Sequence, residues 1–123
     1  MRKAVFDTNI LIDFSHGREE AHDIIRSCHD RIISIVTWVE FLTGIPQEQE
    51  KKARDFLELT FDVYYPDEKV FEQALKNRRE RKIKLPDSMI YACAQLGNAP
   101  LITRNTKDFK HDGKTVIVPY HDL

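Results

Sequence analysis

The sequence predicts an α/β fold, a three-layer α/β/α sandwich around a central, mostly parallel sheet of about four to five short strands. Two observations support this prediction. Short apolar segments of the kind that form buried strands alternate along the chain with longer segments of helical period. The apolar segments also lack a regular alternation of apolar and polar residues, which is typical of strands covered by helices on both faces.

The first half of the chain contains three of the expected strands, over residues 3–7, 31–34 and 61–65. Helices are expected between them, over residues 9–14, 18–29, 36–43 and 46–59. The second of these helices has the i, i+3, i+4, i+7 apolar spacing of an amphipathic helix, at Ala21, Ile24, Ile25 and Cys28.

The second half is expected to add two helices, over residues 67–82 and 86–96, and two strands, over residues 100–103 and 115–118. Pro86 suits the first turn of a helix, and Gly97 is a typical helix end. The inward side of the first of these two helices is predicted to carry Val70, Phe71, Ala74 and Leu75.

Size and composition indicate a single globular domain over residues 1–123, since 41% of the residues are hydrophobic and 32% are charged. A net charge of −1 means that any nucleic-acid contact must come from local basic patches. Two widely separated cysteines are typical of a cytoplasmic protein with reduced, buried thiols. The longest apolar stretch, residues 32–39, falls far short of the ~20 residues of a membrane span, so no membrane association is expected.

Four acidic residues occupy positions at the ends of expected core elements. Asp7 ends the first strand, and open parallel sheets bind ligands at the carboxyl ends of their strands. Glu40 borders the apolar arc of a helix that is expected to be largely buried. Asp87 lies in the first turn of a helix that is apolar almost all round. Asp108 follows another strand and lies three residues after Asn105.

Each acid also has a purely structural interpretation. Asp7 could cap a helix, Asp87 could complement a helix dipole, and Asp108 could close a turn. Glu40 could be a half-exposed residue or the partner of a lysine. Taken together, however, clustered carboxylates need a cation, because two of them 4 Å apart repel by about 4 kcal/mol at an effective dielectric of ~20. Oxygen donors favour Mg²⁺ or Mn²⁺, and none of the five histidines has a zinc-like spacing.

A basic stretch, KNRRERKIK, covers residues 76–84 and contains six basic residues and one acid. It could be a solvated helix end whose cations complement the helix dipole. It could also bind phosphates of a nucleic acid and lead to Asp87, with Arg104, Lys107 and Lys110 extending it. The residues expected to contact phosphates in this second interpretation are Arg78, Arg79, Arg81, Lys82 and Lys84.

Four motifs in this order resemble the PIN-domain family, and more closely the VapC-type ribonuclease toxins of toxin–antitoxin pairs. They are DTNILID from residue 7, T-x-x-E from residue 37, DSMIYACA from residue 87 and TRNTKDF from residue 103. The resemblance spans about residues 5–119. It implies an endoribonuclease that depends on Mg²⁺, with Mn²⁺ as a substitute. Such an enzyme hydrolyses RNA with a metal-activated water and leaves 5′-phosphate and 3′-hydroxyl ends.

The resemblance also implies a role for each matching residue. Asp7, Glu40 and Asp87 match the three main acids and are the expected metal ligands. A metal would bridge the two aspartates, and Glu40 would orient or deprotonate its bound water. Asp108 matches an auxiliary acid. Asn105, where the family often has Asp, is expected to contact a metal-bound water. This departure from the family pattern leaves open whether a second metal binds without substrate. The matches that hold or line the site are Thr8, Asn9 and Thr103.

The implied partners are the RNA substrate, a cognate antitoxin protein and a second copy of the chain in a homodimer. The region around Trp38, Phe41, Phe56 and Leu57 could belong to the hydrophobic core, and the resemblance implies that it could also form the homodimer face and a groove for the antitoxin. Three alternatives remain: a PIN nuclease that matures RNA without an antitoxin, a non-catalytic RNA- or protein-binding PIN module, and an aspartyl-phosphate phosphatase. Asn9 disfavours the last, which usually needs a second Asp at that position.

Overall fold

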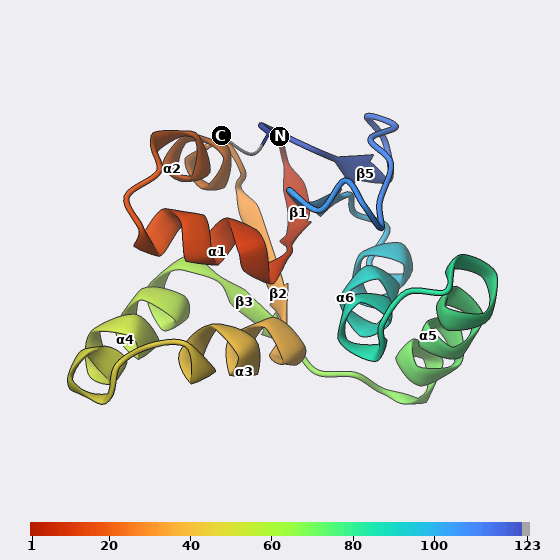
Figure 1. Ribbon diagram of the computed structural model, residues 1–123, viewed down its shortest axis with the longest axis horizontal. Coiled ribbons are helices and arrows are strands. Elements are labelled where there is room, and N and C mark those ends of the chain that lie inside the picture. Colours follow the sequence, from red (N-terminus) through yellow and green to blue (C-terminus); the bar gives the residue numbers. More distant parts are fainter. Residues whose placement is uncertain (122–123) are drawn as a thin grey trace.

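The structure is a computed structural model that describes residues 1–121, so the last two residues of the predicted domain lie outside the described part. Within it, five strands form one sheet in which every neighbouring pair is parallel, in the order β3-β2-β1-β4-β5 (Figure 1). The predicted parallel sheet is therefore confirmed. The strands are β1 (Lys3–Phe6), β2 (Asp30–Ser34), β3 (Asp62–Tyr64), β4 (Leu101–Ile102) and β5 (Val116–Ile117).

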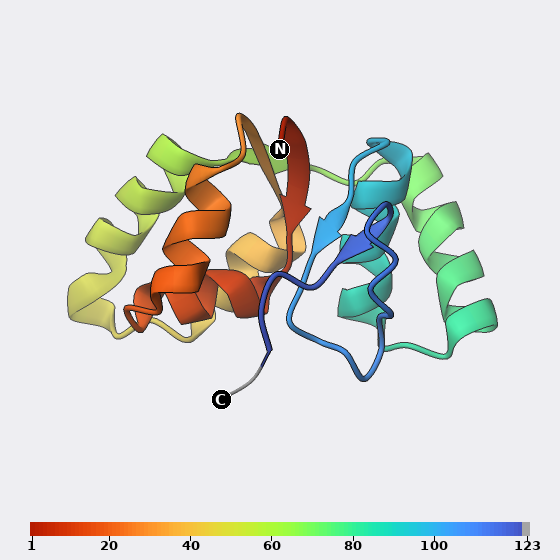
Figure 2. The ribbon, with the colours of Figure 1, turned by 90° about the horizontal axis from the view of Figure 1, so that it is seen from above.

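Helices cover both faces of this sheet, so the predicted three-layer architecture is also confirmed. Helices α1 to α4 lie on one side, whereas α6 packs on the other side with α5 outside it (Figures 1 and 2). The helices are α1 (Thr8–Ser15), α2 (Glu19–Arg26), α3 (Ile35–Thr43), α4 (Glu50–Thr60), α5 (Glu68–Arg81) and α6 (Leu85–Leu96). A short 3₁₀ turn, η1 (Gln47–Gln49), precedes α4 where the sequence predicted one continuous helix.

Strand β1 is buried on both faces. Ala4 and Phe6 belong to the core beneath α1 to α4, whereas Val5 belongs to the core beneath α6, and all three are fully buried. Successive side chains of a strand point to opposite faces of the sheet. An apolar run without alternation is therefore what a central strand between two helical layers requires.

Helix α5 differs from the prediction in which side chains it buries. Val70 and Ala74 are buried as expected, but Phe71 is 55% exposed and Leu75 is 43% exposed, so their predicted inward orientation is wrong. The buried face of α5 also contains Asn77 and packs chiefly on α6. Because α5 is the outermost element on its side, its opposite face has no layer to cover it (Figure 2).

Helix α3 is also less buried than predicted. Only Thr37 and Phe41 are buried in it, and Val39 is 51% exposed. The cause is that the apolar residues of α3 surround most of the helix, whereas its neighbours cover one stripe. Glu40 is accordingly exposed rather than enclosed in an apolar surface.

Both cysteines, Cys28 and Cys93, are buried and free, which confirms that they pack as small apolar residues. Among the helices of residues 1–121, none is long and apolar enough to cross a membrane.

The order of the strands reverses at β1, which marks the space beyond the carboxyl ends of β1 and β4 as the expected ligand crevice. The chain passes from β1 to β2 and β3 on one side, whereas β4 and β5 extend the sheet on the other side of β1. Open α/β sheets bind ligands where the strand order reverses in this way, beyond the carboxyl ends of the strands. Asp7 directly follows β1 and Thr103 directly follows β4 at this point.

Candidate active site

Asp7 lies at the carboxyl end of β1 and is only 4% exposed. Its main-chain N–H donates to the carbonyl of Ile102 on the neighbouring strand (2.9 Å). The main-chain N–H of Thr8 donates to Asp7 Oδ1 (2.7 Å), so Asp7 caps helix α1. The hydroxyl of Thr103 donates to the other oxygen, Oδ2 (2.7 Å). The structural interpretation of Asp7 as a helix cap is thus correct, and it places the carboxylate in the crevice.

Asn9 links three parts of the crevice. Its Nδ2 lies 3.3 Å from Asp7 Oδ2 and 3.2 Å from Thr103 Oγ1, and it donates to both. Its Oδ1 accepts a hydrogen bond from the main-chain N–H of Arg104 (3.0 Å). The side chains of Asn9 and Thr103 therefore face the catalytic candidate Asp7.

Glu40 reaches the same place from helix α3. Its Oε1 accepts a hydrogen bond of 2.6 Å from the hydroxyl of Thr8, which is the residue after Asp7. Thr8 Oγ1 also lies 3.1 Å from the hydroxyl of Thr37, which is fully buried one turn before Glu40. The T-x-x-E motif thus supplies a buried anchor and an exposed acid on one face of the helix.

Asp87 lies in the first turn of α6, directly after Pro86, and is half-buried. Burial raises the pKa of its carboxyl above the usual value, and the charges of Asp108 and Glu40 raise it further. Lys84 acts in the opposite direction. The pKa of Asp87 therefore depends on two acids, Asp108 and Glu40, that lie far from it in the sequence.

The electrostatics of Asp7 completes the cluster. Burial raises its pKa from 3.8 to about 6, and the charges of Asp87 and Glu40 add to this effect. Hydrogen bonds from Thr103 and Thr8 favour the charged form but do not cancel the shift. The four predicted acids thus form one electrostatic cluster. Asp87 and Glu40 act on the pKa of Asp7, and Asp108 and Glu40 act on the pKa of Asp87.

Asn105 and Asp108 form a turn beyond β4. Asn105 Nδ2 donates to Asp108 Oδ2 (2.9 Å), and the main-chain N–H of Asp108 donates to Asn105 Oδ1 (3.2 Å). The main-chain N–H of Asn105 donates to Thr103 Oγ1 (3.0 Å), which ties this turn to the residue that holds Asp7. The turn interpretation is correct, and Asp108 also acts on the charge of Asp87.

The carboxylate oxygens of the cluster are the type of donor that a hard divalent cation prefers. In residues 1–121, no three His, Cys, Asp or Glu side chains are close enough to form a ready-made metal site. Mg²⁺ usually takes only one or two carboxylates and fills its other positions with water and phosphate oxygens. Asp7 and Asp87 are the best candidates, because the charge of Asp87 adds to the raised pKa of Asp7, and a cation between the two carboxylates would relieve that repulsion.

The structure distributes the basic stretch over several places. Arg81 donates to the hydroxyl of Tyr91 (3.1 Å), and its guanidinium lies over that ring, 4.6 Å from the centroid. Arg79 lies on the outer face of α5. Lys84 is exposed and near enough to Asp87 to lower its pKa. The two remaining predicted phosphate contacts, both exposed at the end of α5, are Arg78 and Lys82.

The sequence analysis missed a polar network beside the crevice. Asp13 is 9% exposed and accepts two hydrogen bonds from Arg104, Nε to Oδ2 (2.7 Å) and Nη2 to Oδ1 (3.0 Å). The hydroxyl of Tyr120 also donates to Oδ2 (2.8 Å). Burial alone would raise the pKa of Asp13, but these bonds hold it below its usual value. The guanidinium of Arg104, which was expected to extend the basic stretch, thus binds Asp13, and its contact with RNA stays a prediction.

Comparison with known proteins establishes the family. A family model described as PIN domain matches residues 4–114. The chain belongs to the PIN-domain family. This confirms the family that the four motifs resemble, and the described sheet and helices are PIN-like.

Three relatives illustrate the match, and two of them are named VapC or VapBC. Ribonuclease VapC1 of Methanocaldococcus jannaschii is 30% identical over 113 residues, which are 88% of this chain and 79% of that protein. A chain of a toxin–antitoxin complex from Klebsiella pneumoniae is 41% identical with a TM-score of 0.90, and the match covers 98% of this chain and 100% of that chain. A chain of VapBC-1 from nontypeable Haemophilus influenzae is 27% identical with a TM-score of 0.73, over 89% and 90% of the two chains.

The raised pKa of Asp7 predicts how stability depends on pH without metal. The folded protein binds a proton at Asp7 up to about pH 6, whereas the unfolded chain releases it near 3.8, so stability falls as the pH rises between these values. Asp7→Asn removes this titration. In EDTA, the free energy of unfolding of wild type relative to Asp7→Asn should fall by roughly 3 kcal/mol across this range. Urea denaturation of both proteins at several pH values measures the difference.

At neutral pH in EDTA, Asp7→Asn should accordingly be at least as stable as wild type. A variant that is markedly less stable there would show that the cap and the hydrogen bonds of Asp7 outweigh the cost of its buried charge.

Proposed function

We propose that this protein is a divalent-metal-dependent endoribonuclease of the VapC type, and the toxin of a toxin–antitoxin pair. The observation that carries the proposal is the buried carboxylate of Asp7, whose pKa of about 6 reflects its burial and the charges of Asp87 and Glu40. Such a group at the carboxyl ends of β1 and β4 suits a Mg²⁺ or Mn²⁺ ion. The names of the relatives, Ribonuclease VapC1 and a toxin–antitoxin complex, support the reaction and the biological setting.

The residues of the cluster suit different roles in phosphodiester hydrolysis. Asp7 and Asp87 would hold the metal, which when bound supplies positive charge at the scissile phosphate and acidifies a water. Glu40 is exposed to solvent, and the hydroxyl of Thr8 fixes one of its oxygens, so it would accept the proton of the attacking water. The turn with Asn105 and Asp108, whose charge acts on Asp87, would orient further waters.

Lys84 is the basic residue best placed to attract RNA to the acids. It is exposed, lies three residues before Asp87 and acts on the charge of that carboxyl. An acidic pocket repels a polyanion, so cations at its rim would supply the attraction. Arg78 and Lys82, which are also exposed, would extend this rim.

The antitoxin would bind a hollow on the opposite side of the sheet from α5 and α6. This hollow of about 300 Å³ lies between α1, α3 and α4, and its apolar lining suits an apolar antitoxin segment. The solved relatives from Klebsiella pneumoniae and Haemophilus influenzae come from toxin–antitoxin complexes, which supports such a partner. The apolar residues that line the hollow are Phe14, Phe41, Ile45, Ala53 and Phe56.

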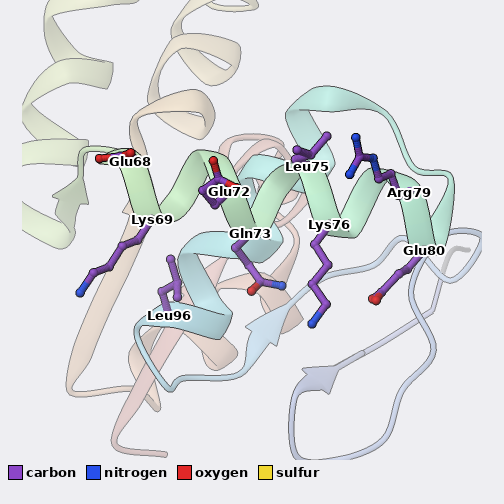
Figure 3. Close-up of a pocket in the computed structure, with 9 residues that line it drawn as sticks. All are labelled: Glu68, Lys69, Glu72, Gln73, Leu75, Lys76, Arg79, Glu80 and Leu96. Atoms are coloured by element: carbon purple, nitrogen blue, oxygen red, sulfur yellow. The ribbon is translucent and has the colours of Figure 1, made fainter.

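The outer face of α5 would form the homodimer. Its first half carries Glu68 and Glu72 with Lys69, and its second half carries Lys76 and Arg79 with Glu80, so the two halves are net acidic and net basic (Figure 3). If two copies pack this face antiparallel about a two-fold axis, the acidic half of each helix meets the basic half of the other. Leu75 in the middle, together with the neighbouring exposed Phe71, would supply apolar contact.

Cleavage of a labelled RNA tests the activity. Wild type should cut it with Mg²⁺ or Mn²⁺ and not with EDTA, and Asp7→Asn or Asp87→Asn should lower the rate by at least about a hundredfold. Lys84→Glu should raise the KM and weaken its salt dependence with little change in kcat. Wild type without metal-dependent cleavage would favour a non-catalytic PIN module. Cleavage that no co-expressed antitoxin inhibits would favour a nuclease of RNA maturation.

A charge exchange on α5 tests the dimer. Glu72→Lys would place two pairs of like charges across the two-fold axis and should raise the dimer dissociation constant about tenfold. Glu72→Lys combined with Lys76→Glu should restore it, whereas Glu58→Lys on the exposed side of α4 should leave it unchanged. Sedimentation of a dilution series measures the constants. A double variant that dissociates as readily as Glu72→Lys would rule out this arrangement.

A further inference from the structure

Two residues of helix α1 hold Arg104, one by its backbone and one by its guanidinium. The main-chain N–H of Arg104 donates to Asn9 Oδ1 (3.0 Å), and its guanidinium donates two hydrogen bonds to Asp13 (2.7 and 3.0 Å). Asn9 and Asp13 are four residues apart, so they lie one turn apart on the same face of α1. One helix face thus fixes both the backbone and the side chain of a residue beyond β4.

This arrangement determines which way the Asn9 amide points. Its oxygen accepts the N–H of Arg104, so its NH₂ group faces Asp7 Oδ2 and Thr103 Oγ1. If the amide turned over, its NH₂ would face the N–H of Arg104, and Asp7 would lose a donor. The orientation of Asn9 therefore depends on where the backbone of Arg104 lies.

The bond between Asp13 and Arg104 is strong enough to hold that backbone in place. It is bidentate and charge-assisted, which is the strongest type of side-chain hydrogen bonding. Tyr120 donates a third hydrogen bond to Asp13 and orients the carboxylate from the other side. Lysine could not reproduce this contact, because it lacks the planar fork of the guanidinium.

We propose that Asp13 and Arg104 are positioning residues for the Asp7 carboxylate and act on it through the amide of Asn9. The inference rests on the proposed nuclease function, and neither residue needs to touch RNA. Anchoring Arg104 also fixes its neighbours Thr103 and Asn105, so one ion pair aligns the end of β4 with the end of β1.

A double-mutant cycle tests this dependence on Asn9. Asp13→Asn should lower kcat for RNA cleavage about tenfold and leave KM nearly unchanged, as is typical for residues that support a metal ligand. In an Asn9→Ala background the same substitution should lower kcat less than about threefold, because the amide through which it acts is absent. Equal losses in both backgrounds would overturn the proposal.

Amide hydrogen exchange of metal-free protein gives a readout that needs no activity. Asp13→Asn and Arg104→Lys should each raise exchange in residues 103–108 about tenfold relative to the rest of the chain. Arg54→Ala is the matched control, because it removes an arginine that lies over an aromatic ring, Trp38 (4.9 Å), and is paired with an acid, Glu50 (2.9 Å), on α4. Unchanged exchange in both variants would contradict the anchoring. Raised exchange with an inactive wild type would support the anchoring and contradict the nuclease function.

Discussion

The burial of the Asp7 carboxylate is the constraint on which the rest of the site depends. A charged group loses its hydration when it is enclosed at the end of a central strand. The N–H of Thr8 and the hydroxyl of Thr103 replace part of that hydration, and the N-terminus of α1 adds a favourable dipole. They do not replace all of it, since the pKa remains raised to about 6 with Asp87 and Glu40 nearby. At neutral pH the site therefore has a negative charge that a divalent cation would neutralise.

The fold explains how residues from distant parts of the chain reach this carboxylate. Because β4 pairs directly with β1, Thr103 and the turn that follows it lie beside Asp7. Helix α3 leaves the neighbouring strand β2 and brings Glu40 to Thr8, and α6 begins with Asp87. The sheet thus sets the positions, while hydrogen bonds set the orientation of Asp7, Glu40 and Asp108. Asn9, on the same face of α1 as Asp13, adds a donor to Asp7.

Much of the fold and the acidic cluster could be predicted from the sequence, because both depend on local patterns. Apolar runs of strand length mark β1 and β4, which Asp7 and Asp108 follow, and Asp87 lies in the first turn of the apolar helix α6. The exposure of Phe71 could not be predicted, because helical spacing shows that a residue is apolar but not whether a second layer covers it. The ion pair between Asp13 and Arg104 was missed for a related reason. Its residues are far apart in the chain, and only the pairing of β1 with β4 brings them together.

We propose that one divalent cation binds between the carboxylates of Asp7 and Asp87. Anomalous diffraction from crystals grown with Mn²⁺ tests it most directly. We expect an anomalous peak in the crevice beyond β1 and β4, with a carboxylate oxygen of each aspartate at about 2.0–2.2 Å and water in the other positions. A Mn²⁺ ion bound elsewhere, or no ion in this crevice at a saturating concentration, would contradict the account.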